Sequence, residues 1–185
     1  MSELPVFDTL GTIAEVSVAF LGFTGVVGVF ADFERSRSSV SLRLWVMVGL
    51  AFATLLLAVL PSVLHHLGVS GPVLWAFCSA GIVAVCLAQF VFVVPRALVE
   101  QRAGRWAQPL IFRLFPVLVV GCFLTQGLNM LGIGFERTAG AYVLGLFLML
   151  IANGLNFIAL LVDLRSDDGS DPVSSPTLSS SNPEP

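Results

Sequence analysis

The sequence contains little charge and no lysine. Only 11% of its 185 residues are charged and 56% are hydrophobic, whereas soluble domains have about 25% charged and about 45 to 50% apolar residues. All nine basic residues are arginines. They are spread over several loops, which argues against a nucleic-acid-binding patch. We therefore expect a membrane protein that does not bind nucleic acid.

Residues that build catalytic and metal sites are also scarce. The chain has two adjacent histidines, His65 and His66, and three cysteines without CxxC spacing, Cys78, Cys86 and Cys122. Neighbours on a helix point about 100° apart, so the two histidines do not readily bind one metal. P-loop, HExxH and GxSxG motifs are missing from the sequence. We expect no enzymatic activity, no metal and no cofactor, with the cysteines acting as small buried hydrophobes.

Five long apolar runs are present instead. About 20 apolar residues at about 1.5 Å each are enough to cross a hydrocarbon core of about 30 Å. The runs do not alternate between apolar and polar residues, as transmembrane β-strands do, so helices are the remaining way to span. The sequence predicts an all-α membrane protein, a bundle of about five transmembrane helices within residues 1–165. The predicted spans are 9–30, 44–64, 73–94, 110–133 and 139–162.

The loops predict an orientation, because arginine and lysine gather in short cytoplasmic loops. The loop after the first span holds Arg35, Arg37 and Arg43, and the loop after the third holds Arg96, Arg102 and Arg105. The other loops have at most one arginine. We expect an external amino terminus and a cytoplasmic carboxyl terminus. The last segment, 166–185, is rich in Ser, Pro and Asp and is predicted to be a disordered cytoplasmic tail.

Four aromatic residues lie close to the predicted span ends. Trp and Tyr favour the membrane–water interface, where one end of the side chain is apolar and the other is hydrated. We expect these residues to anchor the helices at that interface. They are Trp45, Trp75, Trp106 and Tyr142.

Polar residues within the spans predict an outer polar layer around Glu15. With the first helix running inward and the fourth running outward, Thr125, Gln126 and Asn129 reach a similar depth. Glu15 shares a helix face with Gly11, Ala19 and Gly22, and small residues at such spacing allow close helix approach. We expect Glu15 to face a close-packed seam and to bind the amides of the fourth helix.

A second polar set predicts an inner layer. Asn153 and Asn156 lie on one face of the fifth span, at a depth similar to that of Gln89 in the third. Asp163 ends the fifth span and Arg113 begins the fourth, so these two are candidates for an ion pair. Alternatively, Arg113 extends to the inner interface.

Each layer has a structural and a functional interpretation. Polar side chains often hold membrane helices together, but ionisable groups within the membrane also mark proton and ion pathways. Glu15 suits such a relay. No Asp, His or Lys lies between the two layers, so a single chain would hold an incomplete relay, which an oligomer could complete.

Two segments carry a loose resemblance. The stretch IAEVSVAFLGFTGVVGVF and the closing AYVLGLFLMLIANGLNFIALL resemble a group of small uncharacterised bacterial multi-pass inner-membrane proteins. The resemblance implies a similar multi-helix bundle in the bacterial cytoplasmic (inner) membrane, and no activity. We expect a non-enzymatic assembly or accessory subunit that contacts a second copy or another membrane protein within the lipid bilayer. The alternative is a small proton- or ion-coupled channel or carrier centred on Glu15.

Overall fold

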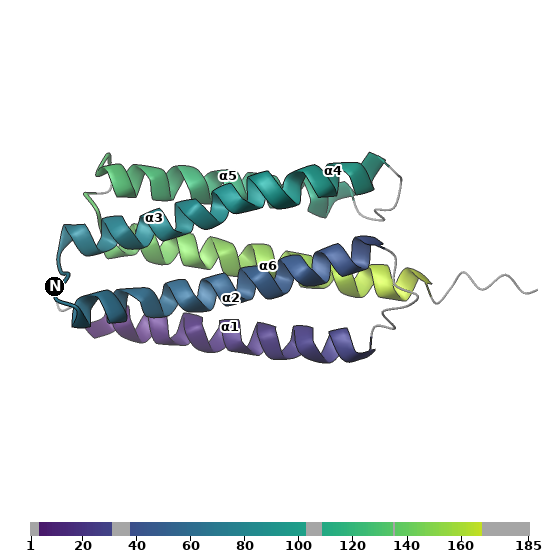
Figure 1. The fold of residues 1–185 in the computed structure, drawn as a ribbon, viewed down its shortest axis with the longest axis horizontal. Helices are drawn as coiled ribbons and strands as arrows, with labels where there is room; N and C mark the ends of the chain where they lie inside the picture. The colour runs from purple at the N-terminus through teal and green to yellow at the C-terminus, as the bar shows by residue number, and fades with distance from the viewer. Residues whose placement is uncertain (1–3, 31–37, 103–108, 135, 168–185) are drawn as a thin grey trace, which may run out of the picture.

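The computed structural model describes residues 4–30, 38–102, 109–134 and 136–167. These residues form long helices that run side by side, and the described part of the chain contains no strand (Figure 1). The predicted all-α bundle is confirmed. The elements are α1 (Leu4–Phe30), α2 (Ser38–His66), α3 (Pro72–Ala88), the π-helical turn η1 (Gln89–Val93), α4 (Val94–Arg102), α5 (Pro109–Leu131) and α6 (Ala139–Asp167).

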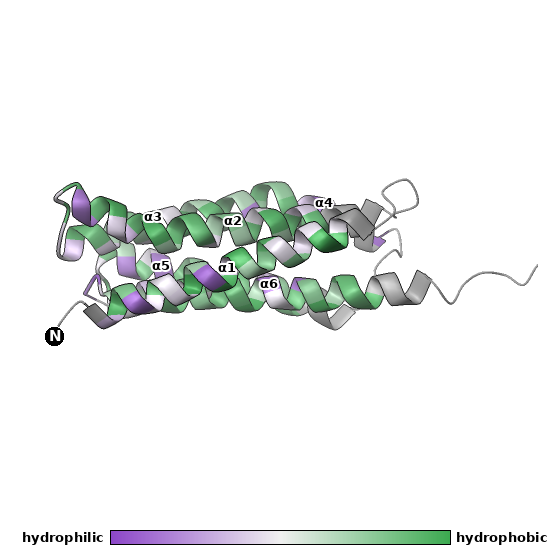
Figure 2. Ribbon diagram, turned by 90° about the horizontal axis from the view of Figure 1, so that it is seen from below, coloured by the Kyte–Doolittle hydropathy of each residue, from purple (hydrophilic) through white to green (hydrophobic). Residues whose placement is uncertain are grey.

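Within the described residues, five helical stretches are long and apolar enough to cross a membrane, as the sequence predicts. Hydrophobic residues cover most of the length of the bundle, and hydrophilic segments gather toward its ends (Figure 2). Large apolar side chains also point outward: Phe23, Phe77 and Phe92 are each more than 60% exposed. Such a surface suits hydrocarbon rather than water, because a soluble monomer rarely exposes so large an apolar area. The chain is a multi-pass membrane protein.

Helix α6 is the centre of the bundle. It contacts α1, α2, α3 and α5, whereas α1 packs mainly on α2, and α5 packs on α3 and α6. Figure 1 shows the result, with α1 and α5 on opposite sides of the molecule. Most buried apolar residues form one cluster that includes Leu57, Ile82 and Leu146. A smaller cluster joins Leu44 and Met47 of α2 to the other end of α6.

The third span differs from the prediction at its inner end. The chain remains helical through the π-helical turn η1 and through α4, so Arg96 and Arg102 lie on a helix and not in a loop. Pro95 explains the turn, since proline has no N–H and its ring clashes with the carbonyl four residues earlier. The Val94 N–H donates instead to the Gln89 carbonyl, five residues back. A π-helical turn thus lets the helix continue past a proline.

The second span also begins earlier than predicted. Arg43 was assigned to a cytoplasmic loop, but it lies in α2 and its side chain is only 2% exposed. The helix starts at Ser38, five residues before Arg43. Arg43 is therefore a buried arginine of the bundle. Arg35 and Arg37 lie outside the described residues, as does Arg105.

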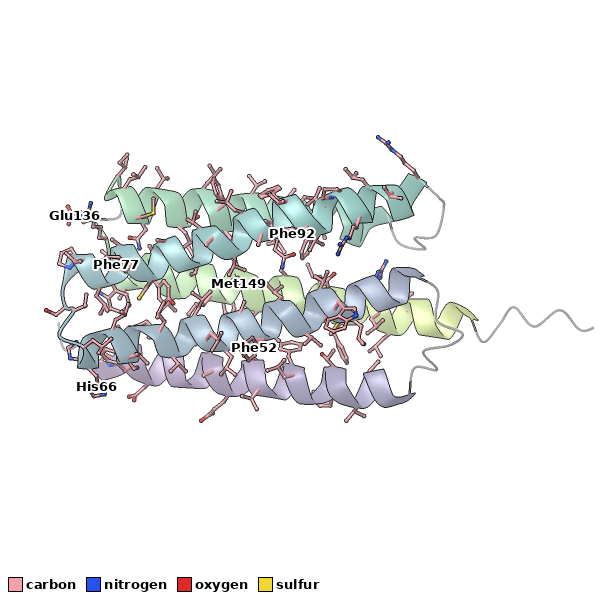
Figure 3. The ribbon with its side chains drawn as sticks, in the orientation of Figure 1. Phe52, His66, Phe77, Phe92, Glu136 and Met149 are labelled. Atoms are coloured by element: carbon pink, nitrogen blue, oxygen red, sulfur yellow. The ribbon has the colours of Figure 1, made fainter. Side chains whose placement is uncertain are left out.

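The start of α5 and the start of α6 lie within one residue of the predicted spans, whereas α1 begins at Leu4 rather than at residue 9. Helix α5 runs without interruption through Pro116. Helix α6 continues past residue 165, which was the predicted end of the bundle, to Asp167. The predicted tail, from residue 168 onward, lies outside the described residues. His66, the last residue of α2, and Glu136, between α5 and α6, lie at the same end of the bundle (Figure 3), as five successive crossings require.

Candidate functional site

A hydrogen-bond network joins three helices near the His66 end of the bundle. Asn129 of α5 donates from Nδ2 to Ser79 Oγ of α3, at 2.8 Å, and to the Thr138 carbonyl, at 3.3 Å. Its Oδ1 accepts from the Thr138 N–H, at 2.9 Å. The amide is fully buried. One side chain therefore links α5 to α3 and to the start of α6.

Gln126 extends the same network one turn deeper. Its Nε2 donates to the Ala141 carbonyl of α6, at 2.6 Å. A Cβ at Gly145 would lie only 2.3 Å from that nitrogen, so only glycine leaves room for the amide. Cys122, the next residue on this face of α5, donates from Sγ to the Gly145 carbonyl, at 3.6 Å. The contact between α5 and α6 is thus formed by polar side chains of α5 and the buried backbone carbonyls of Ala141 and Gly145 on α6.

Tyr142 and Trp75 are part of this interior and are not interfacial anchors, so the prediction for them was wrong. The Tyr142 hydroxyl donates to the Leu57 carbonyl of α2. Its ring contacts Trp75 of α3 at a centroid distance of 5.9 Å. Both side chains are buried, and the Tyr142 hydroxyl has its partner inside the bundle. Trp45 is 69% exposed, as an anchor would be, and Trp106 lies outside the described residues.

Glu15 does not join this network, which corrects the predicted outer layer. Its side chain is exposed on α1, and α1 packs on α2 and α6 rather than on α5. The carboxyl forms no hydrogen bond or ion pair with any residue that the structure describes. Matching depth was not enough for a contact, because depth fixes neither the direction of a side chain nor the neighbour of a helix. Thr125 also stands apart, since its hydroxyl donates to Gly121 of its own helix.

The buried face of α1 shows why Glu15 points outward. Leu10, Ile13, Ser17 and Thr24 are buried at spacings of three, four and seven, which mark one face of a helix. Glu15 lies two residues from both Ile13 and Ser17, about 200° around the axis. It shares the opposite face with exposed Gly11, Ala19 and Gly22.

The predicted inner layer divides in a similar way. Asn153 is fully buried on α6, and neither its Oδ1 nor its Nδ2 has a hydrogen-bond partner in the described part of the chain. The amide of Asn156 donates to Ala152 within the same helix, at 3.1 Å. Gln89 lies on a different helix, at the start of η1. The side chains of Arg113 and Asp163 lie outside the described residues, so their ion pair stays a prediction.

Sequence reasoning missed several interior residues. Ser79 gave no signal because a single serine in an apolar run is common in membrane helices. Nothing in the sequence singled out Gly145 either. The need for glycine there is visible only once the Gln126 side chain is placed against it. The burial of Arg43 was missed too, because an arginine that directly precedes an apolar run is also typical of a cytoplasmic loop. The described residues hold no group of three His, Cys, Asp or Glu residues suited to a metal ion.

Comparison of the chain with protein-family models, with curated proteins and with solved structures finds no match. The site must therefore be interpreted from its own geometry. The buried network consists of neutral amides, hydroxyls and one tyrosine, mostly paired across helices. Such an arrangement holds helices in place and offers no nucleophile activated by a base. Glu15 differs from these groups because it is an exposed carboxyl in the middle of a membrane-spanning helix.

Proposed function

We propose that this protein is a non-enzymatic assembly or accessory protein of the bacterial cytoplasmic membrane and that it acts through helix–helix contacts. The contact surface is the exposed face of α1, defined by Gly11, Glu15, Ala19 and Gly22. The observation that carries the proposal is the exposure of Glu15 on this face, in a segment otherwise suited to hydrocarbon.

An exposed carboxyl in this position requires a partner. Insertion of an ionisable side chain at the centre of a helix costs about 2.5 to 3.5 kcal/mol on translocon scales. Nothing within the described chain offsets this cost for Glu15. A hydrogen-bonding group from another transmembrane helix would do so, because it removes the carboxyl from contact with lipid.

The rest of the face is suited to a close helix contact. A Cβ added at Gly11 or Gly22 would meet no atom within 4 Å. These glycines are therefore not required by the packing of the monomer. Small residues on an open helix face let a second backbone approach closely, which is the main source of association between membrane helices.

The occupant that we propose is α1 of a second copy. When two copies are inserted in the same orientation, their α1 helices are parallel. The two Glu15 side chains then lie at the same depth in the membrane. A protonated carboxyl both donates and accepts a hydrogen bond, so two carboxyl groups that share protons can pair. The contact is then isologous, as in most homodimers.

The alternative function, a proton- or ion-coupled carrier, has less support from the geometry. A relay needs a second exchangeable group within reach of Glu15. Asp8 lies on the same face of α1 but two turns toward the amino terminus, and the buried residues of the described bundle include no carboxyl or histidine. The amides of the predicted outer layer are engaged between α5, α3 and α6 instead.

Energy transfer between donor- and acceptor-labelled copies in liposomes tests the proposal. We expect transfer that falls as lipid dilutes the protein, together with an association constant weakened about 3- to 30-fold by Glu15→Leu, the equivalent of about 0.6 to 2 kcal/mol per hydrogen bond. Glu15→Gln keeps the association, because an amide pair can replace the carboxyl pair. A chain that stays monomeric at every protein-to-lipid ratio would exclude the second copy and leave a different membrane protein as the occupant of α1.

A further inference from the structure

A small cavity lies in the middle of the bundle, away from the α1 face. About 20 Å³ of it is open to the centre of a water-sized particle, which is enough for one water molecule or one ion. Its wall is hydrocarbon except for the side chains of Cys86, Gln89, Cys122 and Met149. Met149 marks its level in Figure 3, about half-way along the bundle.

Three sulfur-bearing residues from three different helices meet at this cavity. Cys86, on α3, and Cys122, on α5, both line the cavity, as does Met149 of α6. Both cysteines are free and buried. Met149 is 4% exposed and lies on α6 one turn after Gly145, whose carbonyl accepts from Cys122. The sulfurs are held by the rigid middle parts of the helices rather than by loops.

Gln89 adds a polar group to the same wall. It is the first residue of the π-helical turn η1, and π-helical turns inside helices frequently occur at functional sites. Its Oε1 is buried and has no hydrogen-bond partner among the described residues. A buried acceptor without a partner beside a space for one particle is a place where a bound group is expected.

We propose that the cavity binds one copper(I) ion, with Cys86, Cys122 and Met149 as ligands. Thiolate and thioether ligands are soft and select Cu(I), whereas Mg²⁺ and Ca²⁺ require oxygen ligands. A structural zinc site needs four nitrogen, sulfur or oxygen ligands in a tetrahedron, and this wall supplies three sulfurs. When a thiolate binds the ion, a Cu–S bond replaces an S–H bond and the proton is released to the medium. Gln89 lines the same cavity, so its side-chain amide lies beside the proposed sulfur ligands.

Titration of the purified full-length protein with Cu(I) tests the proposal, with ascorbate as reductant and bathocuproine disulfonate as competing chelator. We expect one Cu(I) per chain. Cys86→Ser and Cys122→Ser should each weaken binding by about a hundredfold or more, and Met149→Leu by about tenfold, since each removes a soft ligand. Cys78→Ser is the matched control. Cys78 is a buried cysteine of the same helix, eight residues from Cys86, and it does not line the cavity.

X-ray absorption of the copper-loaded wild type provides a second measurement that does not depend on the folding of a variant. We expect a three-coordinate Cu(I) with only sulfur in its first shell. A shell of nitrogen and oxygen, equal retention of copper by the Cys86→Ser/Cys122→Ser double variant, or loss of all copper to the chelator would overturn the proposal. So would a wild type in which the two thiols form only a disulfide that excludes the ion.

Discussion

Gln126 fills the space in which a side chain at Gly145 would stand. Its Nε2 donates to the Ala141 carbonyl at 2.6 Å, and the same atom lies 2.3 Å from the Cβ that any other residue at 145 would carry. The amide and the glycine therefore depend on each other. The central helix α6 accommodates a polar side chain of α5 in this way: the missing side chain at Gly145 leaves space for the amide, and the Ala141 carbonyl accepts its hydrogen bond.

Gly145→Ala should destabilise the bundle by about 1 to 3 kcal/mol, the usual cost of overpacking a core. The new methyl group would displace the Gln126 amide and break its bond to Ala141. Unfolding in mixed detergent measures the effect. Gly154→Ala on the same helix is the control, because its Cβ would meet only Phe20, at 3.8 Å, and it should be neutral or slightly stabilising. Equal stability of the two variants would contradict this account of Gly145.

Asn129 and Ser79 should be energetically coupled. A double-mutant cycle of Asn129→Ala and Ser79→Ala should give a coupling energy of about 0.6 to 1.7 kcal/mol, the range found for interhelical hydrogen bonds in membranes. Asn129→Ala alone should cost more, because Asn129 also bonds Thr138. Thr125→Val serves as the control, since the Thr125 hydroxyl bonds only its own helix. Additive effects within about 0.3 kcal/mol would show that the bond between Asn129 and Ser79 does not contribute.

Reporter fusions test the proposed orientation. A fusion after Arg102 should report the cytoplasm and a fusion after His66 should report the outside, because the arginines of α4 lie at the end opposite His66 and positive residues remain inside. Alkaline phosphatase and a cytoplasmic fluorescent reporter give complementary signals. The reverse pattern would place the amino terminus in the cytoplasm.

Proton flux separates an assembly role from transport. Liposomes that contain the wild-type protein should show the same pH relaxation as liposomes that contain Glu15→Gln, because the buried residues of the described bundle include no carboxyl or histidine that could pass a proton onward from Glu15. A fluorescent pH indicator inside the vesicles reports the rate. Flux in the wild type that Glu15→Gln abolishes would establish the carrier as the function.

The helices can be predicted from the sequence because a span in lipid must pair all of its backbone N–H and C=O groups internally, as a helix does. A span is recognised in the sequence as a long run of apolar residues. The five spans and most of their ends follow from that rule alone. Gln126 and Asn129 could also be selected, since amides in apolar helices need partners. Their actual partners, the backbone of α6 and Ser79, depend on helix neighbours that composition does not encode.

Glu15, Trp75 and Tyr142 show the limit of such reasoning. A membrane helix is apolar on every side, so its sequence carries no clear periodicity to separate the buried face from the lipid-facing one. Depth is predictable from position along the span, but direction is not. Arg43 illustrates the same limit at a helix end, because a buried arginine and a loop arginine look alike until the neighbouring helices are placed.

The proposed contact between copies is made by the α1 face, and Gly22→Leu tests that surface directly. A Cβ at Gly22 would meet nothing within 4 Å, and the same holds at Gly121 of α5, on the opposite side of the bundle. Energy transfer in liposomes should therefore be lost with Gly22→Leu and retained with Gly121→Leu, while both variants stay folded. Transfer that survives Gly22→Leu, or that both substitutions reduce equally, would contradict an interface on α1.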